Sequence, residues 1–219
     1  MHGFATQIIN FLAAILLLLS FAMLSQRRIL SLIHLYTLQG VTLVSANVIL
    51  GYVTADVHLY ISAALTLVLK VGLIPWILYR LVQRLNVRTD VESLLNIPAT
   101  LLIGIVLVIV AFNVASPVSQ LASSVARGTL GIALACVLLS FMMMITRAKA
   151  IPQVIGFLSM ENGLFFAAAA ATNGMPMIVE LGIGLDVLVG ILILGVFMFQ
   201  IREQFDSLDI HHLEKLKDD

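Results

Sequence analysis

Long apolar stretches fill most of the chain and are separated by short polar connections. Each stretch has about 20 residues or more, the length that an α-helix needs to cross the hydrocarbon core of a bilayer. Their continuity excludes the alternating pattern of a transmembrane barrel. We therefore predict an all-α integral membrane protein with about seven transmembrane helices. The seven stretches are residues 4–24, 29–53, 57–79, 95–115, 122–145, 153–172 and 178–201.

The composition supports this class and excludes others. Hydrophobic residues make up 61% of the 219 residues, and the 12 Lys and Arg are balanced by 12 Asp and Glu. A soluble fold of this size could not cover its surface with so few charges. The absence of net charge argues against nucleic-acid binding through a basic face, and the single Cys136 argues against a disulfide scaffold. We expect the lipid bilayer, and no nucleic acid, as a partner.

Basic residues alternate between the connections. The first, third and fifth connections and the C-terminal tail carry most of them, the second and sixth carry none, and the fourth carries Arg127 alone. Because Lys and Arg favour cytoplasmic loops, we predict an external N-terminus and a cytoplasmic C-terminus. The basic residues of the first, third and fifth connections are Arg27, Arg28, Arg80, Arg84, Arg88, Arg147 and Lys149.

Three ionisable residues fall deep inside predicted membrane helices: Lys70, Glu161 and Asp186. A charged residue at the centre of a membrane helix costs at least about 2.5–3.5 kcal/mol, so each requires an explanation. At about 1.5 Å per residue, Glu161 lies about 15 Å from one membrane face and Asp186 about 12 Å from the other. Lys70 lies about 20 Å from the external face by the same measure. The three residues are therefore expected to share one middle layer.

A layer of buried carboxylates and a lysine is typical of a proton relay, because a low dielectric disfavours the charged form of both groups. The alternative is a fixed buried ion pair or a carboxylate that anchors a neighbouring subunit. Three further residues are accessory candidates. His34 titrates near neutrality but lies close to the membrane edge, Gln39 could hold water, and Glu180 would either cap the seventh helix or act as a gate.

The chain contains no nucleotide-binding fingerprint, cysteine cluster or metal-ligand motif, so we expect no cofactor and no catalytic residue in it. The first and last three predicted helices show a weak parallel repeat. In it, Arg28 corresponds to Arg147, Gln39 to Glu161 and Lys70 to Asp186. We therefore divide the chain into an N-terminal three-helix unit, a linking helix with an external loop, and a C-terminal three-helix unit with a cytoplasmic tail. These units comprise residues 1–92, 93–121 and 122–219.

The C-terminal unit resembles a known family of membrane subunits. RAKAIPQVIGFLSMENGLFF (147–166), IVELGIGLDVLVGILILGVF (178–197) and SLDIHHLEKL (207–216) are similar to the K subunit of respiratory complex I and to the C subunit of Mrp antiporters. Asp186 falls where that family has a glutamate in its third helix. Glu161 lies three residues beyond the family's glutamate in its second helix, and Lys70 has no counterpart there.

The whole chain resembles the hydrogenase-4 component E family, including the segment LTLVLKVGLIPWIL (65–78) around Lys70. This resemblance implies a multi-pass, non-catalytic subunit in the plasma (inner) membrane of a prokaryote, within a formate hydrogenlyase-type complex. Its expected partners are antiporter-like membrane subunits and a peripheral hydrogenase module. A nickel–iron centre and iron–sulfur clusters would belong to those partners, and this chain would contribute to proton translocation. A subunit of a multisubunit cation/proton antiporter and a structural membrane anchor remain alternatives.

Overall fold

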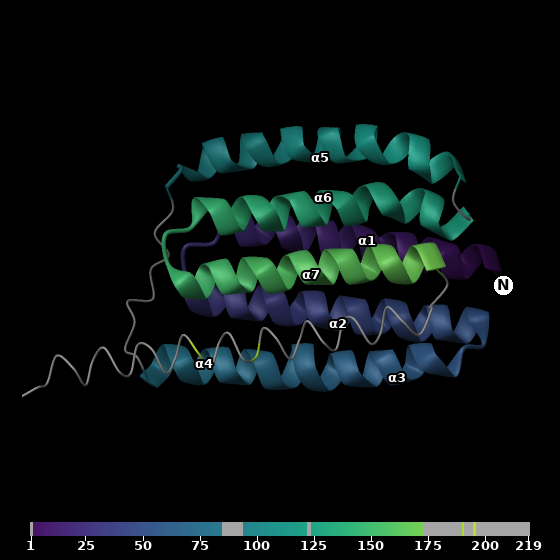
Figure 1. The fold of residues 1–219 in the computed structure, drawn as a ribbon, viewed down its shortest axis with the longest axis horizontal. Helices are drawn as coiled ribbons and strands as arrows, with labels where there is room; N and C mark the ends of the chain where they lie inside the picture. Colours follow the sequence, from purple (N-terminus) through teal and green to yellow (C-terminus); the bar gives the residue numbers. More distant parts are fainter. Residues whose placement is uncertain (1, 85–93, 122–123, 173–189, 191–194, 196–219) are drawn as a thin grey trace, which may run out of the picture.

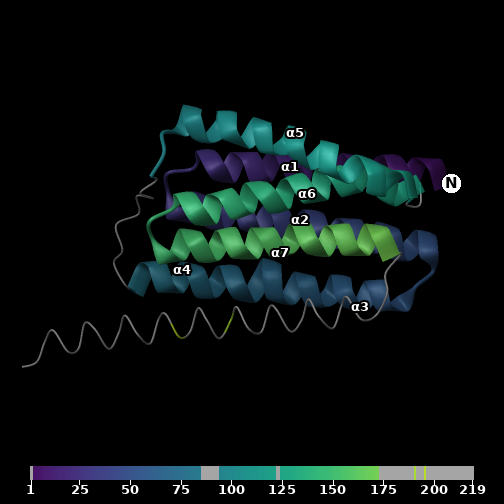
Figure 2. The same ribbon diagram turned by 45° about the horizontal axis from the view of Figure 1, so that its top comes forward.

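The described part of the chain folds into long helices that run side by side (Figures 1 and 2). The computed structural model describes residues 2–84, 94–121, 124–172, 190 and 195. Three of the helices, α3, the π-helix η1 and α4, follow one another without interruption and form a single rod. The helices are α1 (His2–Ser25), α2 (Ile29–Thr54), α3 (Val57–Thr66), η1 (Leu67–Leu73), α4 (Ile74–Arg84), α5 (Ile97–Leu121), α6 (Ser124–Thr146) and α7 (Ala150–Thr172).

Five helices of the described residues are long and apolar enough to cross a membrane, which confirms the predicted class. They span Phe4–Ser25, Ile29–Thr54, Val57–Gln83, Ile97–Pro117 and Thr129–Thr146. The sixth predicted stretch is the helix α7, and the seventh lies outside the described residues apart from Gly190 and Gly195. The total of seven transmembrane helices therefore stays a prediction.

Helix boundaries agree with the apolar stretches to within a few residues, with one difference of note. We expected the fourth helix to end at residue 115, just before Pro117, but α5 continues to Leu121. A proline removes one backbone hydrogen bond, and membrane helices tolerate this because local adjustments satisfy the freed carbonyl. The end of α2 is sharper, because Ala55 adopts a left-handed conformation with φ 54°. Asp56 then caps α3 by accepting a hydrogen bond from the backbone N–H of His58 at 2.9 Å.

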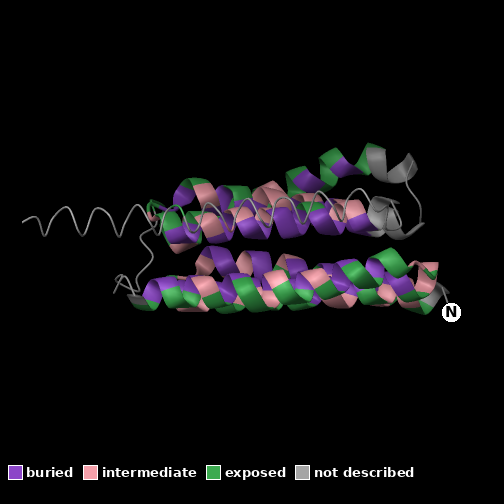
Figure 3. Cartoon of the chain, turned by 60° about the horizontal axis from the view of Figure 1, so that its bottom comes forward, coloured by how far each residue is buried: buried purple, intermediate pink, exposed green. Residues whose placement is uncertain are grey.

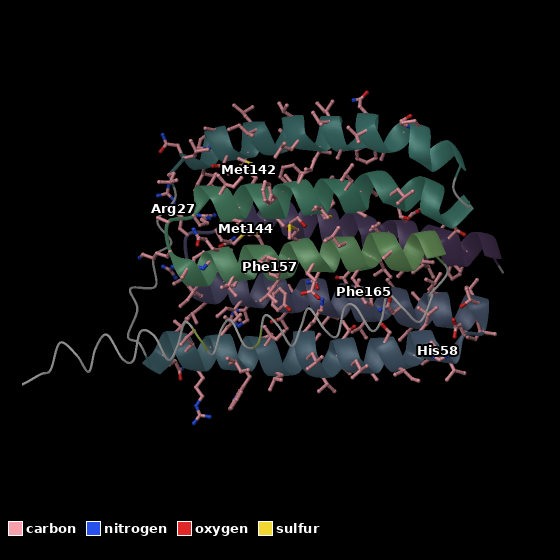
Figure 4. The ribbon with its side chains drawn as sticks, viewed as in Figure 1. Arg27, His58, Met142, Met144, Phe157 and Phe165 are labelled. Atoms are coloured by element: carbon pink, nitrogen blue, oxygen red, sulfur yellow. The ribbon has the colours of Figure 1, made fainter. Side chains whose placement is uncertain are left out.

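Consecutive helices run in opposite directions, so the basic connections gather at one end of the bundle. Figure 4 shows Arg27, between α1 and α2, at the end opposite to His58, which begins α3. The turn that carries Arg147 lies at the same end as Arg27. The backbone N–H of Leu94, which follows the third connection, donates to the carbonyl of Thr146 at 2.9 Å. One end of the described bundle is therefore basic, as the sequence pattern requires.

The core lies between α1, α2, α6 and α7, whereas α5 is covered only on one side. Buried positions face the interior of the bundle and exposed positions face outward (Figure 3). Two apolar clusters build the core, one around Tyr36 and Leu139 nearer the basic end and one around Leu43 and Phe166 nearer the other end. Because α1 packs on α6 and α2 packs on α7, helices of the two predicted three-helix units share this core. The domain boundaries themselves stay a prediction.

Candidate functional site

The structure places a buried ion pair between η1 and α7. The Nζ atom of Lys70 lies 2.9 Å from Oε1 of Glu161, and the two side chains are only 2% and 3% exposed. The residues are 91 positions apart in the sequence, so the fold alone brings them together. Their contact agrees with the common depth estimated from the sequence.

One turn of α7 forms the rest of the lysine's surroundings. Lys70 Nζ also donates to Oδ1 of Asn162 at 3.1 Å, and it lies 5.7 Å from the centroid of the Phe165 ring (Figure 4). Phe165 lies four residues after Glu161 and three after Asn162, so it is a neighbour of both on the surface of α7. An ammonium group has only donors, so it fixes the amide of Asn162 with its oxygen toward Lys70. The carboxylate, the amide oxygen and the ring face are all groups that attract a cation.

The energetics of this site are finely balanced. Removing two charges from water costs several kcal/mol per ion, which the mutual attraction offsets only with good geometry and additional hydrogen bonds. The carboxylate, the amide and the aromatic ring supply such a geometry for the ammonium group. Removing either member of a buried pair costs roughly 3–5 kcal/mol, because the other charge is left without compensation. The pair is therefore a strong interhelical contact. One added proton on Glu161 would remove the attraction that offsets the cost of burying Lys70.

The structure describes two of the other predicted site residues, Gln39 and His34. Gln39 is fully buried, but its Nε2 donates to Oγ of Ser20 on α1 at 3.0 Å. His34 lies on an exposed face of α2. Glu180 and Asp186 lie outside the described residues. Of the six candidates, Lys70 and Glu161 are the two that the described structure brings together.

Asn162 and Phe165 were missed by the sequence reasoning, although both signals were present. Asn162 directly follows Glu161, and Phe165 lies one turn later on the same face. A polar amide in an apolar helix requires a hydrogen-bonding partner, and a buried lysine supplies one. The sequence reasoning also missed the hydrogen bond between Oγ of Ser140 on α6 and Oγ of Ser159 on α7, which are 2.7 Å apart.

Arg147 has a structural role that its place in a basic connection did not reveal. It is only 3% exposed, and its guanidinium donates to the carbonyl of Leu24 at 2.7 Å and to that of Met23 at 3.4 Å. These carbonyls belong to the last turn of α1, where helical donors run out, although the Met23 carbonyl also accepts from the backbone N–H of Gln26 at 3.3 Å. Burial lowers the pKa of Arg147 below its ordinary value, and the positive charge of Arg27 lowers this pKa further. Arg147 thus ties the end of α1 to the turn between α6 and α7.

Within the described residues, no three His, Cys, Asp or Glu side chains gather as metal ligands would. Cys136 is a free, buried thiol on α6.

Long apolar helices around a buried lysine–glutamate pair define a polytopic α-helical membrane protein. The chain belongs to the family of the uncharacterized protein Rv0085 of Mycobacterium tuberculosis, to which it is 32% identical over 212 residues, 96% of both chains. It is also a full-length homologue of hydrogenase-4 component E. The Escherichia coli K12 protein of that name is 24% identical over 212 residues, which cover 97% of this chain and 98% of the relative. The protein of Shigella flexneri gives the same values.

These relatives confirm the resemblance to hydrogenase-4 component E along the whole chain. They are bacterial proteins, consistent with a prokaryotic membrane as the location. No protein-family model matches the chain, and no solved structure matches it.

Proposed function

We propose that this chain is a membrane-arm subunit of an energy-converting complex of the hydrogenase-4 or formate hydrogenlyase type, and that it contributes to proton translocation. The observation that carries the proposal is the ion pair of Lys70 and Glu161, which is buried between two helices. Ionisable residues in such positions are expensive and commonly belong to proton relays. The full-length homology to hydrogenase-4 component E supports the assignment to that type of complex.

The chemistry proposed for the pair is the exchange of one proton. In the charged state Lys70 holds the proton and Glu161 is a carboxylate, whereas transfer over the 2.9 Å contact gives a neutral amine and a carboxylic acid. In the charged state the ammonium group also contacts Asn162 and Phe165. A second proton that reaches Glu161 would remove the attraction and release the lysine. The pair can therefore load and unload protons singly.

The partners follow from the same proposal. Antiporter-like subunits would extend the proton path within the membrane, and a peripheral module with a nickel–iron centre and iron–sulfur clusters would handle the electrons. This chain would supply no catalytic residue of its own. It would cross the membrane seven times, with an external N-terminus, a cytoplasmic C-terminus and a C-terminal unit like the K subunit of complex I.

The experiment compares three variants in inverted membrane vesicles that contain the whole complex. Glu161→Gln keeps the shape and hydrogen-bonding capacity of the side chain but cannot carry the proton. We expect an assembled complex with at least several-fold lower proton translocation per turnover, and a milder loss in Glu161→Asp. Asn113→Ala is the matched control, since this exposed α5 residue bonds only to the carbonyl of Ile109 in its own helix. Normal translocation in an assembled Glu161→Gln complex would refute the relay.

A structural anchor is the second candidate, because a short and fully buried ion pair is also what a fixed helix contact looks like. In that case Glu161→Gln lowers the amount of assembled complex and leaves translocation per assembled complex unchanged. A cation/proton antiporter subunit would retain the relay but require sodium, so the same assay is repeated with and without sodium at constant ionic strength.

A further inference from the structure

Lys70 lies on an unusual helical segment. The residues Leu67–Leu73 form a π-helix between α3 and α4, and the backbone N–H of Ile74 donates to the carbonyl of Leu69, five residues earlier. In an α-helix the same N–H would donate to the carbonyl of Lys70 itself. Short π-helical insertions within α-helices occur frequently at functional sites. A π-helical turn holds more residues than an α-helical turn, and we call the segment Leu67–Leu73 the wide turn. The wide turn therefore includes Lys70 of the candidate site.

Pro75, which directly follows Ile74, explains why the turn is wide. In a regular α-helix Pro75 would have to donate to the carbonyl of Val71, yet it has no N–H, and its ring would clash with that carbonyl. A wider turn in front of the proline relieves the clash. Prolines and π-bulges are two of the few identified causes of irregularity in long helices, and here they lie together.

Gly40 on α2 gives the wide turn its space. A Cβ atom at Gly40 would lie 3.0 Å from Cγ2 of Val71 and 3.5 Å from the carbonyl oxygen of Lys70. The first distance is shorter than an ordinary van der Waals contact, and Val71 is β-branched and therefore stiff. A larger residue at this position would push η1 away from α2, and Lys70 with it.

The burial pattern shows what the wide turn achieves. Thr66, Lys70, Ile74 and Leu78 are all buried and follow one another at intervals of four. In an α-helix, four residues advance by about 400°, so each step would turn the buried stripe by about 40°. In the wide turn each residue turns by less than in an α-helix, so the rotation of the buried stripe around Lys70 is smaller. It lets the lysine face α7 while both flanking helices keep their own buried faces.

We propose that Pro75 and Gly40 are positioning residues that fix the helical register of Lys70 and thereby hold its ammonium group on Glu161 and Asn162. A change of register by one residue would turn the side chain by about 100° and move it off α7. The consequence for proton transfer rests on the proposed function above, whereas the geometric claim does not.

The test measures the geometry and the activity separately. Dicyclohexylcarbodiimide, a lipid-soluble condensing agent, is used to join Lys70 and Glu161 by an amide bond with loss of water, and mass spectrometry quantifies the linked peptides in the intact complex. We expect the linkage in the unmodified chain and a several-fold lower yield in Pro75→Ala and in Gly40→Val. The controls are Pro117→Ala, a proline inside the exposed helix α5, and Gly72→Ala, whose added Cβ would meet only the Leu67 carbonyl oxygen at 3.7 Å.

Each outcome decides one claim. Wild-type yields in both Pro75→Ala and Gly40→Val, or no linkage in the unmodified chain, would overturn the positioning role. Lower yields with unchanged translocation would support the positioning role and refute the relay instead. If one of the two variants fails to assemble, the milder Gly40→Ala takes its place. A fall in both yield and translocation, with both controls unchanged, supports the proposal in full.

Discussion

Lys70 on η1 and Glu161 on α7 form an ion pair of 2.9 Å across 91 residues of sequence. Their helices belong to different predicted units, so the pair joins the two halves of the described bundle. Among the described residues, Glu161 supplies a negative charge to Lys70, whereas Asn162 and Phe165 supply a dipole and a ring face. This division predicts different effects when each of these residues is changed.

The first prediction concerns the lysine. Arginine stays protonated at every accessible pH, so Lys70→Arg keeps the charge but cannot release a proton. If Lys70 is a relay step, this variant assembles and translocates protons at least several-fold more slowly. If Lys70 is only an ion-pair partner, Lys70→Arg stays active, and Lys70→Met destabilises the complex by roughly 3–5 kcal/mol because Glu161 loses its counter-charge. Translocation in vesicles and thermal stability in detergent separate the two cases.

The second prediction concerns Asn162. Asn162→Leu keeps the volume but removes the 3.1 Å contact to the ammonium group. A hydrogen bond to a charged group contributes about 1.5–3 kcal/mol, so we expect a clear loss of thermal stability and a shift in the pH profile of coupled turnover. Phe165→Leu tests the ring in the same way, with a smaller effect of about 0.5–2 kcal/mol. An unchanged pH profile in Asn162→Leu would show that the amide does not tune the pair.

The sequence predicted that Lys70, Glu161 and Asp186 lie at one depth and left open which of them form a pair. Charge placement and helix rise put Lys70, Glu161 and Asp186 in one layer, because depth depends only on distance along each helix. Which residues touch depends on which helices are neighbours, and apolar periodicity does not give this. The π-helical turn around Lys70 was not predicted because a regular α-period was assumed, although Pro75 was visible in the sequence.

Two hydrogen bonds with the same sequence spacing occur in the two predicted three-helix units, in a register that differs from the predicted repeat. Gln39 donates a hydrogen bond to Ser20 between α2 and α1, and Ser140 shares one with Ser159 between α6 and α7. In both cases the two partners are 19 positions apart in the sequence. The same interval that separates Ser20 from Ser140 also separates Arg27 from Arg147. The sequence comparison had instead set Gln39 beside Glu161. Loosely spaced polar residues in apolar helices define a repeat only to within a turn, and the contacts fix the register.

The third prediction follows from the cap on α1. Arg147→Ala leaves the carbonyl of Leu24, in the last turn of α1, without the donor that Arg147 supplies, at a cost of roughly 1–3 kcal/mol. We expect a lower melting temperature of the purified protein in detergent. Arg28→Ala is the control, since Arg28 is exposed in the matching turn and its loss stays within about 0.5 kcal/mol. A melting temperature of Arg147→Ala equal to that of the unmodified protein would refute the capping role.

The fourth prediction concerns orientation. Because the basic turns lie at one end of the bundle, reporter domains fused after Arg88, after Ala148 and at Asp219 report a cytoplasmic position. A fusion after Gly51, near the opposite end, reports an external one. A fusion at Asp219 that is active only outside the cytoplasm would contradict the seventh transmembrane helix.

The last prediction concerns Asp186, which lies outside the described residues and is assigned to the relay from its depth alone. Asp186→Asn should reduce translocation while the complex stays assembled, as Glu161→Gln should. If both carboxylates lie on one path, the double variant loses little more than the more severe single variant, because a series path is blocked only once. Two independent paths would instead multiply the losses. If Asp186→Asn alone has no effect, the relay does not include Asp186, and the Lys70–Glu161 pair must pass its protons through groups on partner subunits.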